Sequence, residues 1–172
     1  MTESNVPALR PQARLAAARS AYAALRPRVE AGEPWPLAEY FGTEPESSWG
    51  PREVLAHVTE MLPYWLGEFE RIVVAGRPSG NALPFGRTAA DTLRVGILER
   101  DRTLPLRELF DRIDSGIGRW ERRLAAGTPG EGSAIGLHPR LGEMTANRTR
   151  DQFVLDHLEG HVEQLAALLA EP

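Results

Sequence analysis

Residues 157–165 read HLEGHVEQL and lie near the end of a long amphipathic segment. His157 and His161 are four residues apart, so on a helix both imidazoles lie on one face, with Cβ atoms about 5–6 Å apart. Two side chains in this position can bind one cation, as in other helical H-x-x-x-H sites. From the spacing alone, a pair of ordinary core histidines is an equally good interpretation.

The helical arc that carries the two histidines is the one we expect to be buried. At about 100° per residue, it also holds Phe153, Leu165 and Leu168. A buried imidazole without a polar partner costs free energy. A metal ion is one partner that would satisfy both rings.

A third candidate ligand, His57, lies beside an apolar stripe that includes Val54 and Val58. Three neutral imidazoles leave a coordination position open for water, as in catalytic zinc sites. The fourth histidine, His138, precedes Pro139 in a glycine-rich segment and has no helical register with the others. We predict that it is a capping or surface residue, with a place at the mouth of a pocket as the alternative, and not a ligand.

Apolar residues at three- and four-residue spacing predict four main helices and one short helix. A glycine- and proline-rich stretch, residues 76–92, reads as a long crossover. Pro63 lies inside the second helix and should kink it or break one hydrogen bond. No strand-like alternation of useful length is found. We therefore predict a single all-α domain over residues 1–172, a four-helix bundle with a long crossover loop, whose helices span residues 11–31, 50–75, 91–102, 103–126 and 145–170.

Composition excludes several kinds of chemistry. The 172 residues include no cysteine, which excludes disulfides, thiolate-ligated zinc and a protein thiol nucleophile. All 20 basic residues are arginines, they are interleaved with acidic residues, and the net charge is −4, so a nucleic-acid site is not expected. No stretch predicts a membrane helix or a signal peptide. The expected location is therefore the cytoplasm.

Three segments together resemble the DinB-like (DinB/YfiT-like) superfamily of metal-binding proteins. Residues 49–58, WGPREVLAHV, are similar to its second-helix motif, and residues 157–165 are similar to its last-helix motif H-x-x-x-H-x-x-Q-[LI]. Residues 138–145, HPRLGEMT, resemble the segment before that helix in one branch. The resemblance implies a four-helix bundle, often a homodimer, that binds zinc or nickel through His57, His157 and His161.

The resemblance favours a metal-dependent enzyme acting on a small-molecule substrate. Because the chain has no cysteine, thiol chemistry would need a low-molecular-weight thiol. The resemblance implies a thiol such as glutathione, bacillithiol or mycothiol, in a transferase or isomerase reaction, and a thiol of the mycothiol type is the one we predict. The alternatives are a metal-dependent hydrolase, a non-catalytic metal-binding or stress-related protein, and a metal-free dimeric interaction module.

Two carboxylates on the second helix lie close to His57 in the sequence. Glu60 is the candidate for proton transfer, although a solvated helix surface is the favoured interpretation of it. Glu53 is expected to orient His57 or to cap the helix. Three tryptophans are expected to pack in the core, with an apolar pocket wall as the alternative: Trp49, Trp65 and Trp120.

Overall fold

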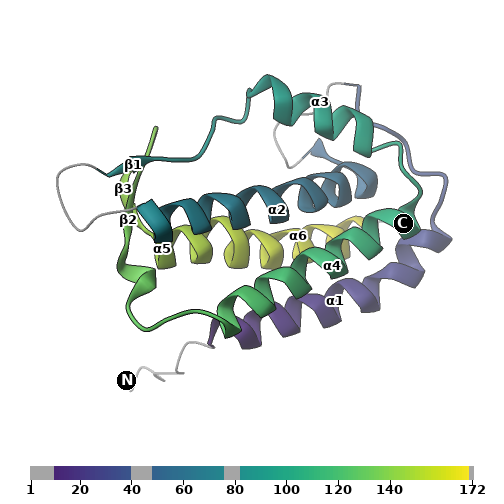
Figure 1. The fold of residues 1–172 in the computed structure, drawn as a ribbon. Coiled ribbons are helices and arrows are strands. Elements are labelled where there is room, and N and C mark those ends of the chain that lie inside the picture. Colours follow the sequence, from purple (N-terminus) through teal and green to yellow (C-terminus); the bar gives the residue numbers. More distant parts are fainter. Residues whose placement is uncertain (1–9, 40–47, 76–81, 171–172) are drawn as a thin grey trace, which may run out of the picture.

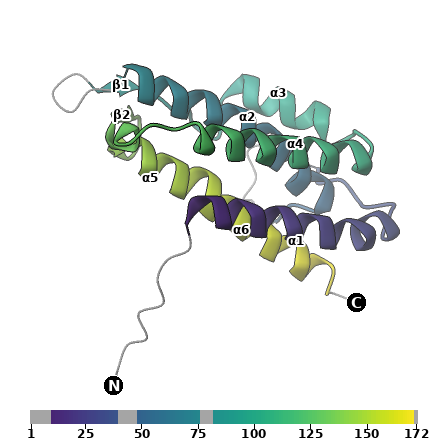
Figure 2. The ribbon, with the colours of Figure 1, turned by 60° about the horizontal axis from the view of Figure 1, so that its bottom comes forward.

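The computed structural model describes residues 10–39, 48–75 and 82–170. Four long helical segments pack side by side and form the bundle, with a shorter helix, α3 (Thr92–Asp101), along α2 (Figures 1 and 2). The fourth segment is continuous but has three parts, of which the middle one, η3, is π-helical. The segments are α1 (Pro11–Ala31), α2 (Pro51–Ala75), α4 (Leu106–Ala125), and α5 (Ala146–Arg150) with η3 (Asp151–Leu155) and α6 (Asp156–Leu168).

The connection between α2 and α4 is the crossover that the sequence predicts. It passes through a short strand, β1 (Leu83–Pro84), and then through α3, which returns the chain to the opposite end of the bundle. As a result α2 and α4 run in the same direction, and α6 runs against both (Figure 1). Residues 76–81 of the predicted crossover lie outside the described residues.

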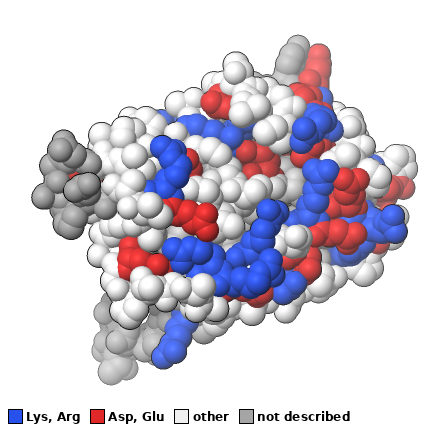
Figure 3. All heavy atoms as spheres, in the orientation of Figure 1, with Lys and Arg blue, Asp and Glu red and all other residues white. Residues whose placement is uncertain are grey.

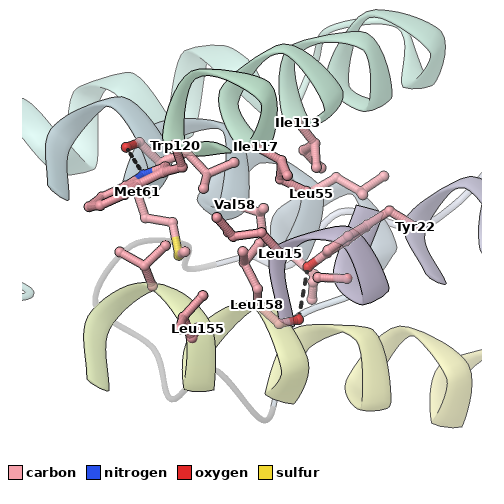
Figure 4. Close-up of a cluster of buried hydrophobic side chains, with 14 of the residues drawn as sticks. Leu15, Tyr22, Leu55, Val58, Met61, Ile113, Ile117, Trp120, Leu155 and Leu158 are labelled. Atoms are coloured by element: carbon pink, nitrogen blue, oxygen red, sulfur yellow. Dashed lines mark hydrogen bonds between the residues drawn. The ribbon is translucent and has the colours of Figure 1, made fainter. Parts of the chain in front are cut away.

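The core lies where the four helices meet. Figure 4 shows Leu15 of α1, Leu55 of α2, Ile117 of α4 and Leu158 of α6 pointing toward one another, and all four are fully buried. Burying one side chain of this size stabilises a fold by about 1.5–3 kcal/mol. The amphipathic stripes predicted from the sequence therefore form one continuous core.

Local signals explain three of the helix starts. Pro51 occupies the first position of α2, where its missing N–H costs nothing. The Asp91 side chain accepts a hydrogen bond from the Arg94 N–H at the start of α3, and Thr145 caps α5 through the Arg148 N–H. Helix α2 continues through Pro63 from end to end.

One predicted helix start is wrong. The sequence places the N-cap of the third main helix at Thr103, whereas α4 begins at Leu106 with Pro105 as N-cap. Proline disfavours the helical conformation in the residue before it, here Leu104. The Thr103 hydroxyl instead donates to the Arg100 carbonyl at the end of α3.

A small sheet at one end of the bundle was not predicted. Strand β2 (Ile135–His138) pairs in parallel with β1 and antiparallel with β3 (Gly142–Thr145), in the order β1-β2-β3 (Figure 1). The strands are two to four residues long, which is too short for an alternating pattern to be recognised. The sheet places His138 at the end of β2, beside the Gly86 backbone.

Charged side chains of both signs are interspersed on the face seen in Figure 3. Several arginines bridge helices, as in the ion pairs of Arg14 with Glu159 and Arg19 with Asp114. None of the helices within the described ranges combines the length and apolar character that crossing a membrane requires.

Candidate metal centre

The fold brings together the three histidines that the sequence singles out. His57 comes from α2, and His157 and His161 come from α6 on the facing side. One ring nitrogen from each lies within 4.8 Å of the others, and the ring centroids are 5.0–5.4 Å apart. Two ligands of a tetrahedral zinc ion lie about 3.3 Å apart. Modest side-chain rotations would therefore bring all three onto one ion.

Burial in this cluster favours the neutral imidazole of His57. His57 and His161 are 5% and 4% exposed, and His157 is half-buried. Burial holds the pKa of His57 well below its usual value, and His161, His157, Arg94 and Arg87 lower this pKa further. The neutral ring is the form that binds a metal. The three rings thus offer donor atoms that fit a divalent ion, and His57 is held in the form that binds one.

Gln164 fixes the orientation of one of these rings. Its Oε1 lies 2.9 Å from His161 Nδ1. An amide oxygen can only accept, so Nδ1 carries the proton and the lone pair is on Nε2. Trp49 is buried against the same cluster, with its ring 5.1 Å from His57 and 6.4 Å from His161. Trp49 is thus a core residue, as expected, and it packs against the histidine cluster.

We expect Gln164→Leu to weaken metal binding about 10- to 100-fold, the usual effect of losing a group that orients a ligand. Gln164→Glu, which keeps an acceptor beside Nδ1, should retain most of the affinity. Competition with a chromophoric chelator measures both variants. Equal affinity in Gln164→Leu and wild type would show that the contact does not orient His161.

The π-helical segment η3 directly precedes α6, the helix that carries His157 and His161. A π-helical turn contains an extra residue and so shifts the helical register after it.

Phe153, in η3, stacks on Trp65 with ring centroids 4.2 Å apart and planes 3° apart. The Phe153 ring also lies 5.2 Å from the His138 ring, measured between centroids. Of the arc predicted to be buried, His161 and Leu165 are buried, while its other members are partly exposed.

A cavity of about 340 Å³ adjoins the cluster and is lined in part by His57 and His157. Glu60 also lines it and is 6% exposed, so the expectation of a solvated carboxylate is wrong. It forms an ion pair with Arg87, whose guanidinium lies 3.6 Å from the centre of the Tyr64 ring. Burial with this partner explains how a charged residue occupies the inner face of α2.

The remaining predicted residues take structural positions. His138 is buried in the wall of the same cavity, and its Nδ1 accepts the N–H groups of Arg140 and Leu141, so it caps the turn after β2. Glu53 is fully buried and accepts the N–H of Ala38, a contact with the segment before α2. Trp65 lines the cavity. The contribution of Arg87 and Arg94 to this wall was not foreseen, because no spacing rule links them to α2.

Together, the bundle and its three-histidine cluster define a helical protein with a candidate metal centre between two facing helices. A model of the DinB superfamily matches residues 14–165, and the chain belongs to that superfamily. Searches of curated proteins and of solved structures gave no significant match.

Proposed function

We propose that this protein is a metal-dependent enzyme that uses a low-molecular-weight thiol to modify or isomerise a small electrophilic substrate. The observation that carries the proposal is the position of His57 and His157 in the wall of a 340 Å³ cavity. A metal centre that only stabilised the fold would need no such access. The proposed ligands are His57, His157 and His161, and the ion is zinc or nickel.

In this proposal the protein binds the metal ion and the substrate, and the ion would activate the nucleophile. When bound, the divalent ion would lower the pKa of a coordinated water or thiol, which makes a nucleophile at neutral pH. Gln164 holds the His161 ring in the tautomer that such an ion requires. Because the sequence has no cysteine, the thiol of the proposed reaction would come from a small molecule. The family resemblance suggests one of the mycothiol type.

Glu60 is the proposed proton-transfer group. One of its oxygens is held by Arg87, and the other, Oε2, is buried with no hydrogen-bond partner among the described residues. A carboxylate oxygen at the cavity wall can accept a proton from a substrate or thiol and return it later. Glu60→Gln keeps the shape of the side chain, so this variant should lower turnover while leaving metal content unchanged.

The test is to incubate zinc- or nickel-loaded protein with mycothiol, bacillithiol and glutathione separately, with monobromobimane as the electrophile. A metal-dependent rate with at least one thiol is the expected result. Hydrolysis of an ester panel without thiol would instead identify a metal-dependent hydrolase. Inactivity in both assays would favour a non-catalytic metal-binding protein.

The proposal includes the homodimer that the family resemblance implies. Light scattering on the full chain tests it directly. A monomer would require each bundle to act alone, with its own cavity.

A further inference from the structure

A second hollow adjoins the histidine cluster, and it also has a volume of about 340 Å³. Its described lining comes only from the fourth helical segment, whereas the cavity beside His57 is lined mainly by α2, the crossover, α3 and the β2–β3 turn. We call it the α6 hollow, and its described lining residues are Gln152, Asp156, His157, Gly160, His161 and Gln164.

The three histidines lie between the two spaces. His57 lines the cavity, His161 lines the α6 hollow, and His157 lines both. One ring nitrogen from each lies within 4.8 Å of the others. The cluster therefore forms a partition, and an ion bound there would be accessible from either side.

The α6 hollow and the cavity differ in chemistry. Apart from the histidines, the side chains that line the hollow are Gln152, Asp156 and Gln164, which offer two amides and a carboxylate. Oxygen atoms of these groups bind divalent cations. In the cavity, the only carboxylate among the described lining residues is Glu60, and Arg87 already pairs with it. The hollow therefore suits a hydrated cation better than the cavity does.

Helix α6 is also acidic. Residues 156–168 include three carboxylates, Asp156, Glu159 and Glu163, and no arginine or lysine. Asp156 and Glu159 share a single arginine, Arg14, so these three side chains carry one net negative charge. The Asp156 side chain is 60% exposed at the edge of the hollow. A negative potential at such an entrance raises the local concentration of cations.

Gly160 leaves a gap in the wall of the α6 hollow. Asp156, Gly160 and Gln164 are four residues apart, so they lie on one face of α6. Gly160 is exposed, and a Cβ placed there would meet no other side chain of the described residues within 4 Å, apart from its two chain neighbours. Glycine is a poor helix former, and no turn requires it in this continuous helix. Its effect here is to keep a path open between two polar side chains.

We propose that the divalent ion enters and leaves the three-histidine centre through the α6 hollow, and that the cavity on the His57 side is left to the substrate. The inference rests on the proposed metal centre but not on catalytic activity. A hydrated cation would be attracted by Asp156. It would exchange part of its water shell for oxygen atoms of the hollow before the imidazoles bind it. Metal exchange would then not require an empty substrate cavity.

The experiment measures the rate at which the full-length protein exchanges zinc. Zinc-loaded protein is mixed in a stopped-flow instrument with a chromophoric chelator, at concentrations where the release rate no longer depends on the chelator. Competition with the same chelator gives the equilibrium affinity, and the uptake rate follows from the two. Gly160→Leu, whose side chain would fill the gap, should slow both release and uptake about tenfold or more. Its affinity should be unchanged, because an obstructed path raises the barrier in both directions equally.

Two variants are matched controls for Gly160→Leu. Gly160→Ala brings a similar gain in helix propensity but adds only one methyl group, so it should exchange zinc nearly as fast as the wild type. Ala89→Leu adds an aliphatic side chain at an exposed position in the cavity wall and should leave both rates unchanged. Equal slowing by Ala89→Leu and Gly160→Leu would contradict the proposed route.

Asp156→Asn tests the charge without filling the hollow. It should slow zinc uptake about two- to fivefold at low ionic strength, and the effect should disappear at high salt because the attraction is screened. Glu163→Gln removes an exposed carboxylate of α6 outside the hollow and should slow uptake less. This pair decides the outcome if circular dichroism or the zinc affinity shows that Gly160→Leu is disturbed. No slowing by either variant, or equal slowing by both, would overturn the proposal.

The results also separate this inference from the metal centre itself. Wild-type exchange rates in Gly160→Leu, at unchanged zinc affinity, would overturn the route and leave the metal centre in place. Failure of the wild type to bind zinc would overturn both. Turnover is not part of the measurement, so the absence of thiol-dependent activity would leave the result on the route intact.

Discussion

Replacing His161 with alanine should remove most of the metal from the protein. The wild type, purified without chelators or a polyhistidine tag, is expected to carry about one equivalent of zinc or nickel per chain, as a three-histidine site would. At structural zinc sites about 10–16 kcal/mol of binding free energy is shared among four ligands. Losing one ligand should therefore cost about 2.5–4 kcal/mol and weaken binding roughly 70- to 900-fold.

His138→Ala is the control for this measurement. His138 lies in the same cavity wall, but its Nδ1 is held by the Arg140 and Leu141 amides and it is absent from the three-histidine cluster. Its replacement should leave the metal content unchanged. Elemental analysis of both variants by mass spectrometry decides the matter. Full metal content in His161→Ala would show that His161 is not a ligand. Loss of metal in His138→Ala would show that His138 belongs to the metal centre.

The helical bundle was predictable because its helices are long and amphipathic. In α4, inward residues recur at helical spacing from Leu106 to Trp120, and nearly all of them are buried. The histidine cluster was predictable for a related reason. His157 and His161 must share a face on any helix, and the motif resemblance supplied His57 as their partner across the bundle.

The surroundings of the cluster were not predictable, because they depend on contacts between distant segments. Arg87 and Glu60 are 27 residues apart and meet only because the crossover folds back along α2. The π-helical segment also escapes periodicity, since one extra residue in a turn leaves the apolar pattern on both sides intact. The prediction that Glu60 is exposed to solvent failed for the first of these reasons, because its partner Arg87 lies outside α2.

Trp120→Ala should destabilise the fold more than any substitution at the metal centre or in the cavity wall. Trp120 is fully buried on α4, where its indole N–H donates to the Leu62 carbonyl of α2 at 3.0 Å (Figure 4). Its ring also contacts Phe69 edge-on, with centroids 5.4 Å apart. Truncating a large buried aromatic costs about 3–5 kcal/mol. That is a large part of the about 5–15 kcal/mol that stabilises a typical domain.

Two further substitutions separate the causes of this loss. Trp120→Phe removes the hydrogen bond to Leu62 but keeps an aromatic ring, so it should cost about 1–2 kcal/mol. Val74→Ala, at a position 85% exposed, should change stability by less than about 0.5 kcal/mol. Urea denaturation should be followed on metal-free protein, because an ion that binds only the folded state adds its own stabilisation. Equal losses in Trp120→Phe and Trp120→Ala would mean that the indole hydrogen bond, and not the packing of the ring, joins α4 to α2.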